Sequence, residues 1–458
     1  QVKEYRLRLN NKKESLDEYY NKKITSAGEN FYVKYHFDLR EVNNLVQLFL
    51  PKVYISPLTT IEGVYMGGYT SLFSINTTID TLQVGPHGFY NNSLDVHTFK
   101  NHDSPEIRAD TRIVSLTQSW QDDKVMSDSL VLNLMWDGNH IDTELLLKQS
   151  DNGNYVDITG QVDFRETQTE VHFDPSILYI LDKDWHFKAD NQIVIARKEI
   201  DFRNFKLSHE EQDIVLTGKI SDELDEKLIV DVHNLQLEVL NTIMRKKHQG
   251  QVNGSLLLSN IYSDLIVESD IRLDSFYIND FSIGDLHAQS FWDNQNGRLN
   301  IAADLYREGD KKIALAGYIE PENQEEQIHA YAYMNGANLK IIEPFAEDYF
   351  SNLEGNIDGE YQVSGNLKQP LITGTGNITG GQVKVNYLNT TYRFQANLSF
   401  KQKTMLIRRM IVYDEDDNIS NLRGYIEHDK LQDFYLDIGG SLNNFKVLNK
   451  SAKDNDLY

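Results

Sequence analysis

Apolar and polar residues alternate along most of this chain, from about residue 73 to residue 445. Between Tyr392 and Phe400, every even position is apolar or aromatic and every odd position is polar. A period of two residues is typical of a β-strand with one buried and one solvated face. Turn signals such as Asn296-Gly297 separate the alternating runs, as in β-hairpins. The pattern predicts a mostly all-β fold of antiparallel strands.

Helical periodicity is confined to three brief stretches, Asp38 to Leu50, Glu238 to Lys247 and Leu339 to Phe350. Each stretch is followed by a Gly-x-x-x-Gly pattern that opens a strand, as at Gly355 to Gly359. The recurrence of this cassette indicates an internal repeat. We expect the short helices to brace or line the sheet, because their apolar sides need a partner.

A repeat of one-sided strands adds apolar area to one face without closing a compact core, which favours an elongated array. Two arrangements can then cover the apolar face. The sheet can fold onto itself as a dry sandwich or barrel, or it can stay bent open as a trough. Alternation alone does not distinguish between these two arrangements.

Composition narrows the classes of function. The 45 Lys and Arg residues are outnumbered by 69 Asp and Glu residues, which gives a formal net charge of −24. This sign argues against a nucleic-acid partner, because phosphate binding depends on clustered cations. No run of apolar residues reaches the length of a membrane-spanning helix. Because the sequence starts at Gln1 and opens directly into alternating residues, we expect a mature or internal piece of a longer protein.

Motifs for catalysis or metal binding are missing from the sequence. Cysteine is absent, which excludes disulfides and thiolate metal sites. The acidic run Asp414 to Asn418 resembles the start of a calcium loop, but Ile419 stands where the loop needs glycine. We interpret this run as a solvated turn between strands. We therefore expect no enzymatic activity, no metal and no cofactor, although carboxylates from distant strands could still form a glycosidase-like pair.

The last part of the chain resembles the TamB family, the translocation and assembly module proteins of the diderm bacterial envelope, particularly its Bacteroidetes-type members. The resemblance depends on the segments 353–359, 363–374, 387–392 and 424–428. The most specific part is the string Gly-x-Leu-x-x-Pro-x-x-x-Gly, which starts at Gly365 and precedes a glycine-rich strand.

The resemblance implies an elongated, twisted antiparallel sheet curled into a U-shaped apolar trough, as in AsmA-like and repeating β-groove lipid-transfer proteins. The implied segments are N-terminal strands with an amphipathic helix (1–60), a β-groove segment (61–236), two β-groove repeats (237–338 and 339–450) and the beginning of a C-terminal domain that the chain lacks (451–458). Residues that would line the lipid-binding groove are Val156, Ile158, Val162, Phe164, Leu216, Ile220, Ile271, Leu273, Phe394, Ala396, Leu398 and Phe400.

The same resemblance implies a function. The expected protein is a non-catalytic conduit for phospholipid across the periplasm to the outer membrane. Its partners would be phospholipid acyl chains, an Omp85-type outer-membrane barrel protein and an inner-membrane anchor outside this chain. One alternative is a periplasmic assembly factor that aids outer-membrane protein insertion by strand addition. Another is a carbohydrate-active or purely structural β-solenoid with a dry interior.

Overall fold

The computed structural model describes residues 31–101, 106–120, 125–149, 153–221, 223, 225–242, 247–262, 265–323, 325–343, 349–367, 369–429 and 432–449. Strands hold 74% of the residues and helices 4%, which confirms the predicted all-β class. The chain divides into two compact units, Gln1–Lys246 with Ser259–Tyr262 (unit 1) and Lys247–Leu258 with Ser263–Tyr458 (unit 2). No described helix is both long and apolar enough to cross a membrane.

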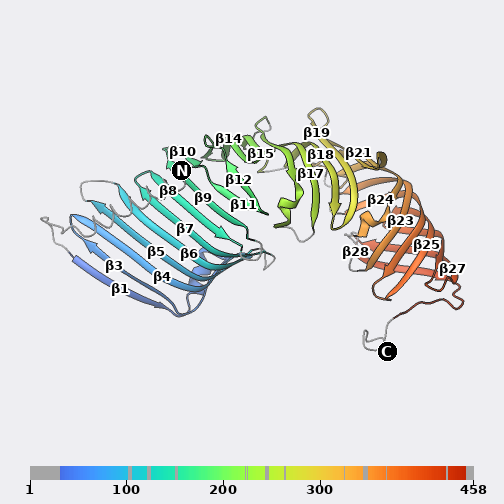
Figure 1. Ribbon diagram of the computed structural model, residues 1–458, viewed down its shortest axis with the longest axis horizontal. Helices are drawn as coiled ribbons and strands as arrows, with labels where there is room; N and C mark the ends of the chain where they lie inside the picture. Colours follow the sequence, from blue (N-terminus) through green and yellow to red (C-terminus); the bar gives the residue numbers. More distant parts are fainter. Residues whose placement is uncertain are drawn as a thin grey trace. The chain divides into compact units, whose positions relative to one another are not determined.

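From β3 to β9, each strand of unit 1 pairs with the next strand along the chain, while β1 pairs with β3 and β2 pairs with β4, and all of these pairings are antiparallel (Figure 1). The strands are β1 (Phe31–Leu39), β2 (Val53–Ile55), β3 (Thr59–Gly67), β4 (Thr70–Val84), β5 (His87–Asn101), β6 (Ile107–Trp120), β7 (Val125–Asp137), β8 (His140–Lys148), β9 (Tyr155–Phe164), β10 (Gln168–Phe173), β11 (Ile177–Ile180), β12 (Lys183–Phe187), β13 (Gln192–Ala196), β14 (Glu199–His209), β15 (Gln212–Ile220) and β16 (Leu228–Gln236).

The sheet of unit 1 divides between β9 and β14. β9 pairs with both β10 and β11, while β14 pairs with both β13 and β12. Asn191 joins the two branches, because its side-chain amide accepts a hydrogen bond from the Phe173 N–H and donates one to the Phe173 carbonyl. Asn191 is fully buried. A side chain therefore takes the place of a missing backbone partner, as buried backbone groups require.

In unit 2, successive strands from β18 to β28 pair antiparallel, and Figure 1 shows its last strands following a curved path. The strands are β17 (His248–Ser259), β18 (Ile266–Ile278), β19 (Phe281–Asp293), β20 (Arg298–Arg307), β21 (Asp310–Ile319), β22 (Ile328–Asn338), β23 (Phe350–Asn366), β24 (Gln369–Val385), β25 (Thr390–Gln402), β26 (Thr404–Tyr413), β27 (Ile419–Asp429) and β28 (Gln432–Gly440).

Bulges interrupt the strand pairing in both units. In unit 1, Ser129 of β7 has a φ of 55° and lies where the register between β7 and β8 shifts. In unit 2, Gly336 has a φ of 59° within a bulge of β22 and donates its N–H to the Asp358 carboxylate at 2.6 Å. Bulges increase strand twist and bend the sheet. They supply local curvature that regular alternation would not.

The helical segments are shorter than the sequence predicts. The only helix within 38–50 is α2 (Asn43–Phe49), because the alternation of β1 continues to Leu39. The other two stretches hold the 3₁₀ turns η1 (Leu237–Thr242) and η2 (Leu339–Ile342) in the part of the chain that the structure describes. Residues 243–246 and 344–348 of the predicted helices lie outside the described residues, as does the predicted segment 451–458.

The expectation was that these segments brace or line the sheet. Buried apolar residues show bracing by the two 3₁₀ turns, whereas α2 makes no such packing contact. Leu237 of η1 and Leu339 of η2 are buried. In contrast, Leu48 and Phe49 of α2 are 76% and 78% exposed. The side chain of Asn43 attaches α2 to β2 through two hydrogen bonds to the Ile55 backbone. Polar bonds, rather than apolar packing, hold this helix.

Candidate functional site

An uncovered apolar face extends across unit 1. Strand register places one row of cross-strand partners on this face, one from each of six adjacent strands: Thr77, Leu94, Ile113, Leu132, Leu145 and Ile158. Directly paired residues share a face of the sheet. We call this set the apolar row.

The opposite face of the same strands is polar. The neighbouring row on that face consists of Asn76, Asp95, Arg112, Asn133, Glu144 and Thr159. The contrast between the two rows follows from the period of two residues along each strand. One face of this part of unit 1 is therefore polar and the other is apolar.

Solvent reaches the side chains of the apolar row. Leu94, Ile113, Leu132, Leu145 and Ile158 are all half-buried, and none of them is buried. A second packed layer would remove such residues from water almost completely. Among the described residues, no such layer covers the row, so this part of the sheet is an open apolar wall.

The six predicted groove residues of unit 1 lie on this apolar face. Val156, Ile158 and Val162 of β9 are half-buried, and Phe164 is 40% exposed. A second row links β9 to later strands through Val162, Val171, Ile193, Phe202, Gly218 and Leu228. Leu216 and Ile220 of β15 flank Gly218, two residues away on either side, and therefore share this face.

The predicted groove residues of unit 2 are arranged differently. Ile271 and Leu273 of β18 are half-buried opposite Ala288 and Leu286 of β19. Phe394, Ala396 and Leu398 of β25 are buried in a cluster that extends over β22 to β27, with Phe400 packed against it. The structure thus places these β25 side chains in a packed core.

Close packing in this cluster depends on glycines. The Tyr361 ring lies over Gly359 and Gly376, where a Cβ atom would come within 2.6 Å and 2.0 Å of the hydroxyl oxygen. Tyr361 is 8% exposed, and its hydroxyl has no hydrogen-bond partner among the described residues. Burial raises the pKa of Tyr361 to about 12, and the nearby Asp358 carboxylate adds to the effect. The repeated glycine pattern therefore makes room for aromatic rings against the sheet.

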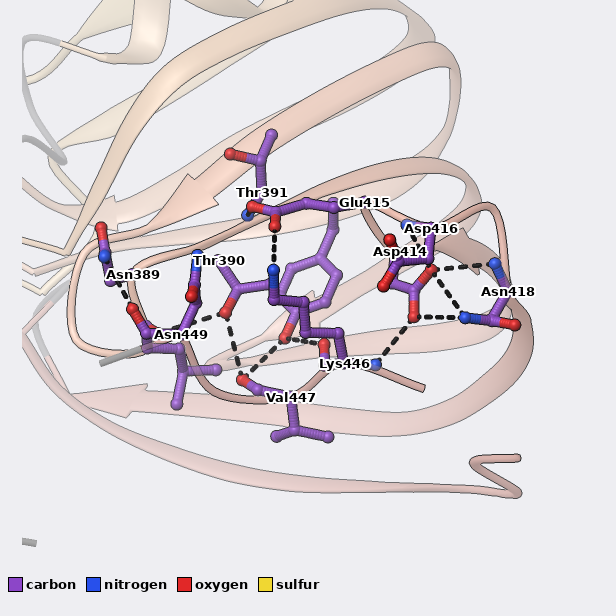
Figure 2. Close-up of polar contacts among 12 residues, drawn as sticks. Asn389, Thr390, Thr391, Asp414, Glu415, Asp416, Asn418, Lys446, Val447 and Asn449 are labelled. Atoms are coloured by element: carbon purple, nitrogen blue, oxygen red, sulfur yellow. Dashed lines mark hydrogen bonds and ion pairs between the residues drawn. The ribbon is translucent and has the colours of Figure 1, made fainter. Parts of the chain in front are cut away.

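Residues Ser441–Asn449 form a strap that crosses the ends of β25 and β26 (Figure 2). The Lys446 N–H donates to the Asp414 carboxylate at 2.7 Å, and the Lys446 ammonium bonds Glu415 at 2.6 Å. Phe445 stacks on Tyr392 with ring centroids 5.7 Å apart, and the Tyr392 hydroxyl donates to the Val447 carbonyl at 3.0 Å. The strap closes the apolar cluster at this end of the strands.

Asp414 organises the turn to which the strap is bound. Its carboxylate accepts hydrogen bonds from the backbone N–H groups of Asp416, Asn418 and Lys446. Burial alone would raise the Asp414 pKa, but these donors hold it below its ordinary value. The turn predicted between β26 and β27 is present, but the prediction that it is only solvated is wrong for Asp414, which is 1% exposed.

One histidine site was missed by the sequence analysis. His140 lies on the polar face, with one ring nitrogen 3.0 Å from Asp163 and the other 3.1 Å from Asp142. Partial burial would lower the His140 pKa, but the two carboxylates raise it above its ordinary value. The spacing of Asp142 two residues along β8 was the available signal, whereas Asp163 required the strand register. Among the described residues, no group of three or more His, Asp or Glu side chains is placed to hold a metal ion.

Comparisons with protein-family models, with curated proteins and with solved structures find no match to this chain. The resemblance to the TamB family, and the envelope location that it implies, therefore remain predictions.

Proposed function

We propose that this chain is a non-catalytic conduit that carries phospholipid acyl chains along the apolar face of unit 1. The observation that carries the proposal is the apolar row, whose five aliphatic members on β5 to β9 stay open to solvent. At about 4.8 Å per strand the row is roughly 24 Å long, which exceeds the roughly 15 Å thickness of one hydrocarbon leaflet. An acyl chain has room to slide along such a surface.

The energetic reason for a conduit is the cost of exposing lipid to water. At about 0.8 kcal/mol per methylene, transfer of a two-chain phospholipid into water costs on the order of 20 kcal/mol. A continuous apolar wall lowers this cost along the path. From β5 to β9 the apolar row consists of aliphatic side chains, so it offers similar affinity at successive strands, which favours movement over tight retention.

The proposed setting follows from the resemblance to the TamB family. We place the chain in the periplasm of a diderm bacterium, between an inner-membrane anchor outside this chain and an Omp85-type partner at the outer membrane. The polar face and the net charge of −24 suit a protein that remains in solution between two membranes.

The alternative function is assembly of outer-membrane proteins by strand addition. It is favoured by β1, whose described pairing uses only the edge facing β3. Tyr32 and Phe37 of β1 are 62% and 56% exposed. An incoming strand would gain backbone hydrogen bonds at this edge.

Photo-crosslinking tests the conduit proposal. A photoreactive residue at Ile158, exposed to labelled phospholipid, should form lipid adducts, because this side chain faces the open wall. The matched position Gln161 on the same strand faces the polar side and should form few. Leu398 should also form few adducts, because it lies in the packed cluster of unit 2. Equal labelling at Ile158 and Gln161 would contradict the proposal.

A further inference from the structure

A cavity of about 250 Å³ lies in unit 1 between the β11–β12 hairpin and η1. Its lining residues are Leu181, Lys183, Gln236, Glu238 and Val239. A volume of this size corresponds to roughly eight water molecules at about 30 Å³ each. The cavity therefore has room for a small polar group, but it is too small for an acyl chain.

Two opposite charges line this cavity without partners. Neither the Lys183 ammonium nor the Glu238 carboxylate makes a hydrogen bond or ion pair with any described residue, and Glu238 Oε2 is buried. Both residues are half-buried, and each charged group is available for a charge-assisted hydrogen bond to a ligand of opposite charge. The Lys183 ammonium and the Glu238 carboxylate do not form an ion pair with each other.

The Lys183 side chain lies on the more buried face of β12. Lys183 is half-buried, whereas its neighbours Asp182 and Asp184 are exposed. Two residues further along the same face, Trp185 is 1% exposed, and its indole N–H has no acceptor among the described residues. This part of the apolar face therefore holds two hydrogen-bond donors, the Lys183 ammonium and the Trp185 indole N–H, without acceptors among the described residues.

The cavity borders the apolar face. Lys183 pairs with Ile180, and Trp185 pairs with Leu178. Leu178 in turn pairs with Val156 of β9, one of the predicted groove residues. Because paired residues share a face, the Lys183 side chain lies on the same side of the sheet as the proposed acyl path.

We propose that this cavity binds the headgroup of a zwitterionic amino-phospholipid, with the phosphate at Lys183 and the primary ammonium at Glu238. The proposal rests on the conduit function, since it assigns the acyl chains of the same lipid to the apolar face beside Val156. Charge-assisted hydrogen bonds to phosphate and to ammonium account for the specificity. The cavity then selects among lipids that the apolar face alone would not distinguish.

Lipid titrations of the purified chain, followed by native mass spectrometry, test this assignment. The probes are phosphatidylethanolamine, phosphatidylglycerol and diacylglycerol with identical short acyl chains. Phosphatidylethanolamine should bind about tenfold more tightly than diacylglycerol, as expected for charge-assisted contacts. Lys183→Gln should weaken both phospholipids, whereas Glu238→Gln should weaken phosphatidylethanolamine and leave phosphatidylglycerol unchanged. Diacylglycerol affinity should be the same in all variants, which also reports that they are folded.

The control variant is Lys188→Gln, which removes an exposed lysine that pairs with Asp190 outside the cavity. It should bind all three lipids like the unmodified chain. Loss of selectivity in this control would overturn the assignment to Lys183.

The outcomes separate the two proposals. If no probe binds, including diacylglycerol, the conduit function fails. If diacylglycerol binds but phosphatidylethanolamine shows no preference, or its preference survives both cavity variants, the headgroup site fails and the conduit remains. Equally tight binding of soluble phosphoethanolamine would identify a site for a water-soluble ligand and would overturn the lipid assignment.

Discussion

At the scale of single residues, the packed cluster of unit 2 contains one buried polar atom, the Tyr361 hydroxyl oxygen, that lacks a hydrogen bond to any described residue. The Tyr361 ring fills space over two glycines, but its buried hydroxyl has no hydrogen-bond partner in the part of the chain that the structure describes. The ring and the hydroxyl therefore make opposite contributions to stability. The ring removes apolar surface from water, whereas an unsatisfied buried hydroxyl is unfavourable.

This opposition gives a prediction for two variants at one position. Tyr361→Phe should leave the free energy of unfolding unchanged or raise it by about 1 kcal/mol, because it removes only the unsatisfied hydroxyl. Tyr361→Ala should lower it by about 3–5 kcal/mol, because a cavity remains above Gly359 and Gly376. Chemical denaturation of the purified chain measures both. A large loss of stability in Tyr361→Phe would mean that the hydroxyl has a partner in solution.

At the scale of elements, the attachment of the strap, and with it the stability of unit 2, should depend on the charge of Asp414. Asp414→Asn removes the carboxylate that accepts the N–H groups of Asp416, Asn418 and Lys446, and should lower the unfolding temperature of unit 2 by about 5 °C at neutral pH. The Asp414 pKa lies below its ordinary value of 3.8 in the folded state. Its stabilising effect is therefore complete above the unfolded-state pKa and is lost as the pH falls through the lower folded-state pKa.

Thermal unfolding of both proteins between pH 2 and pH 7 measures this dependence. The difference in unfolding temperature should be constant near neutral pH and should shrink below about pH 4. A difference that persists unchanged into strong acid would contradict a role for the charge. Asp416→Asn is the control, since it keeps the backbone N–H that Asp416 donates to Asp414 and removes a carboxylate that acts on Lys446 only through its charge.

The sequence predicted the strands correctly, but it did not predict which of their side chains are buried by other parts of the chain. Alternation around Ile158 and around Leu398 is equally regular, and both segments are strands. The structure leaves Ile158 half-buried on an open wall but buries Leu398 in a core closed by Phe445. Local periodicity specifies which side chains share a face, whereas burial depends on segments distant in sequence, such as the strap. The cavity at Lys183 and Glu238 was missed for the same reason, because its two charged groups lie 55 positions apart in the sequence.

At the scale of the whole molecule, the net charge of −24 should control how the chain meets a membrane. Repulsion from an anionic surface slows encounter, and it is screened beyond about 10 Å at 0.1 M salt and about 3 Å at 1 M salt.

If the chain takes up lipid as proposed, extraction of labelled phosphatidylethanolamine should be about tenfold slower from vesicles rich in phosphatidylglycerol than from zwitterionic vesicles at low salt. In 1 M salt the two rates should converge, while the rate from zwitterionic vesicles changes little. Stopped-flow fluorescence dequenching measures all four rates. Faster extraction from the anionic vesicles would show that a local basic surface, rather than the net charge, governs the encounter.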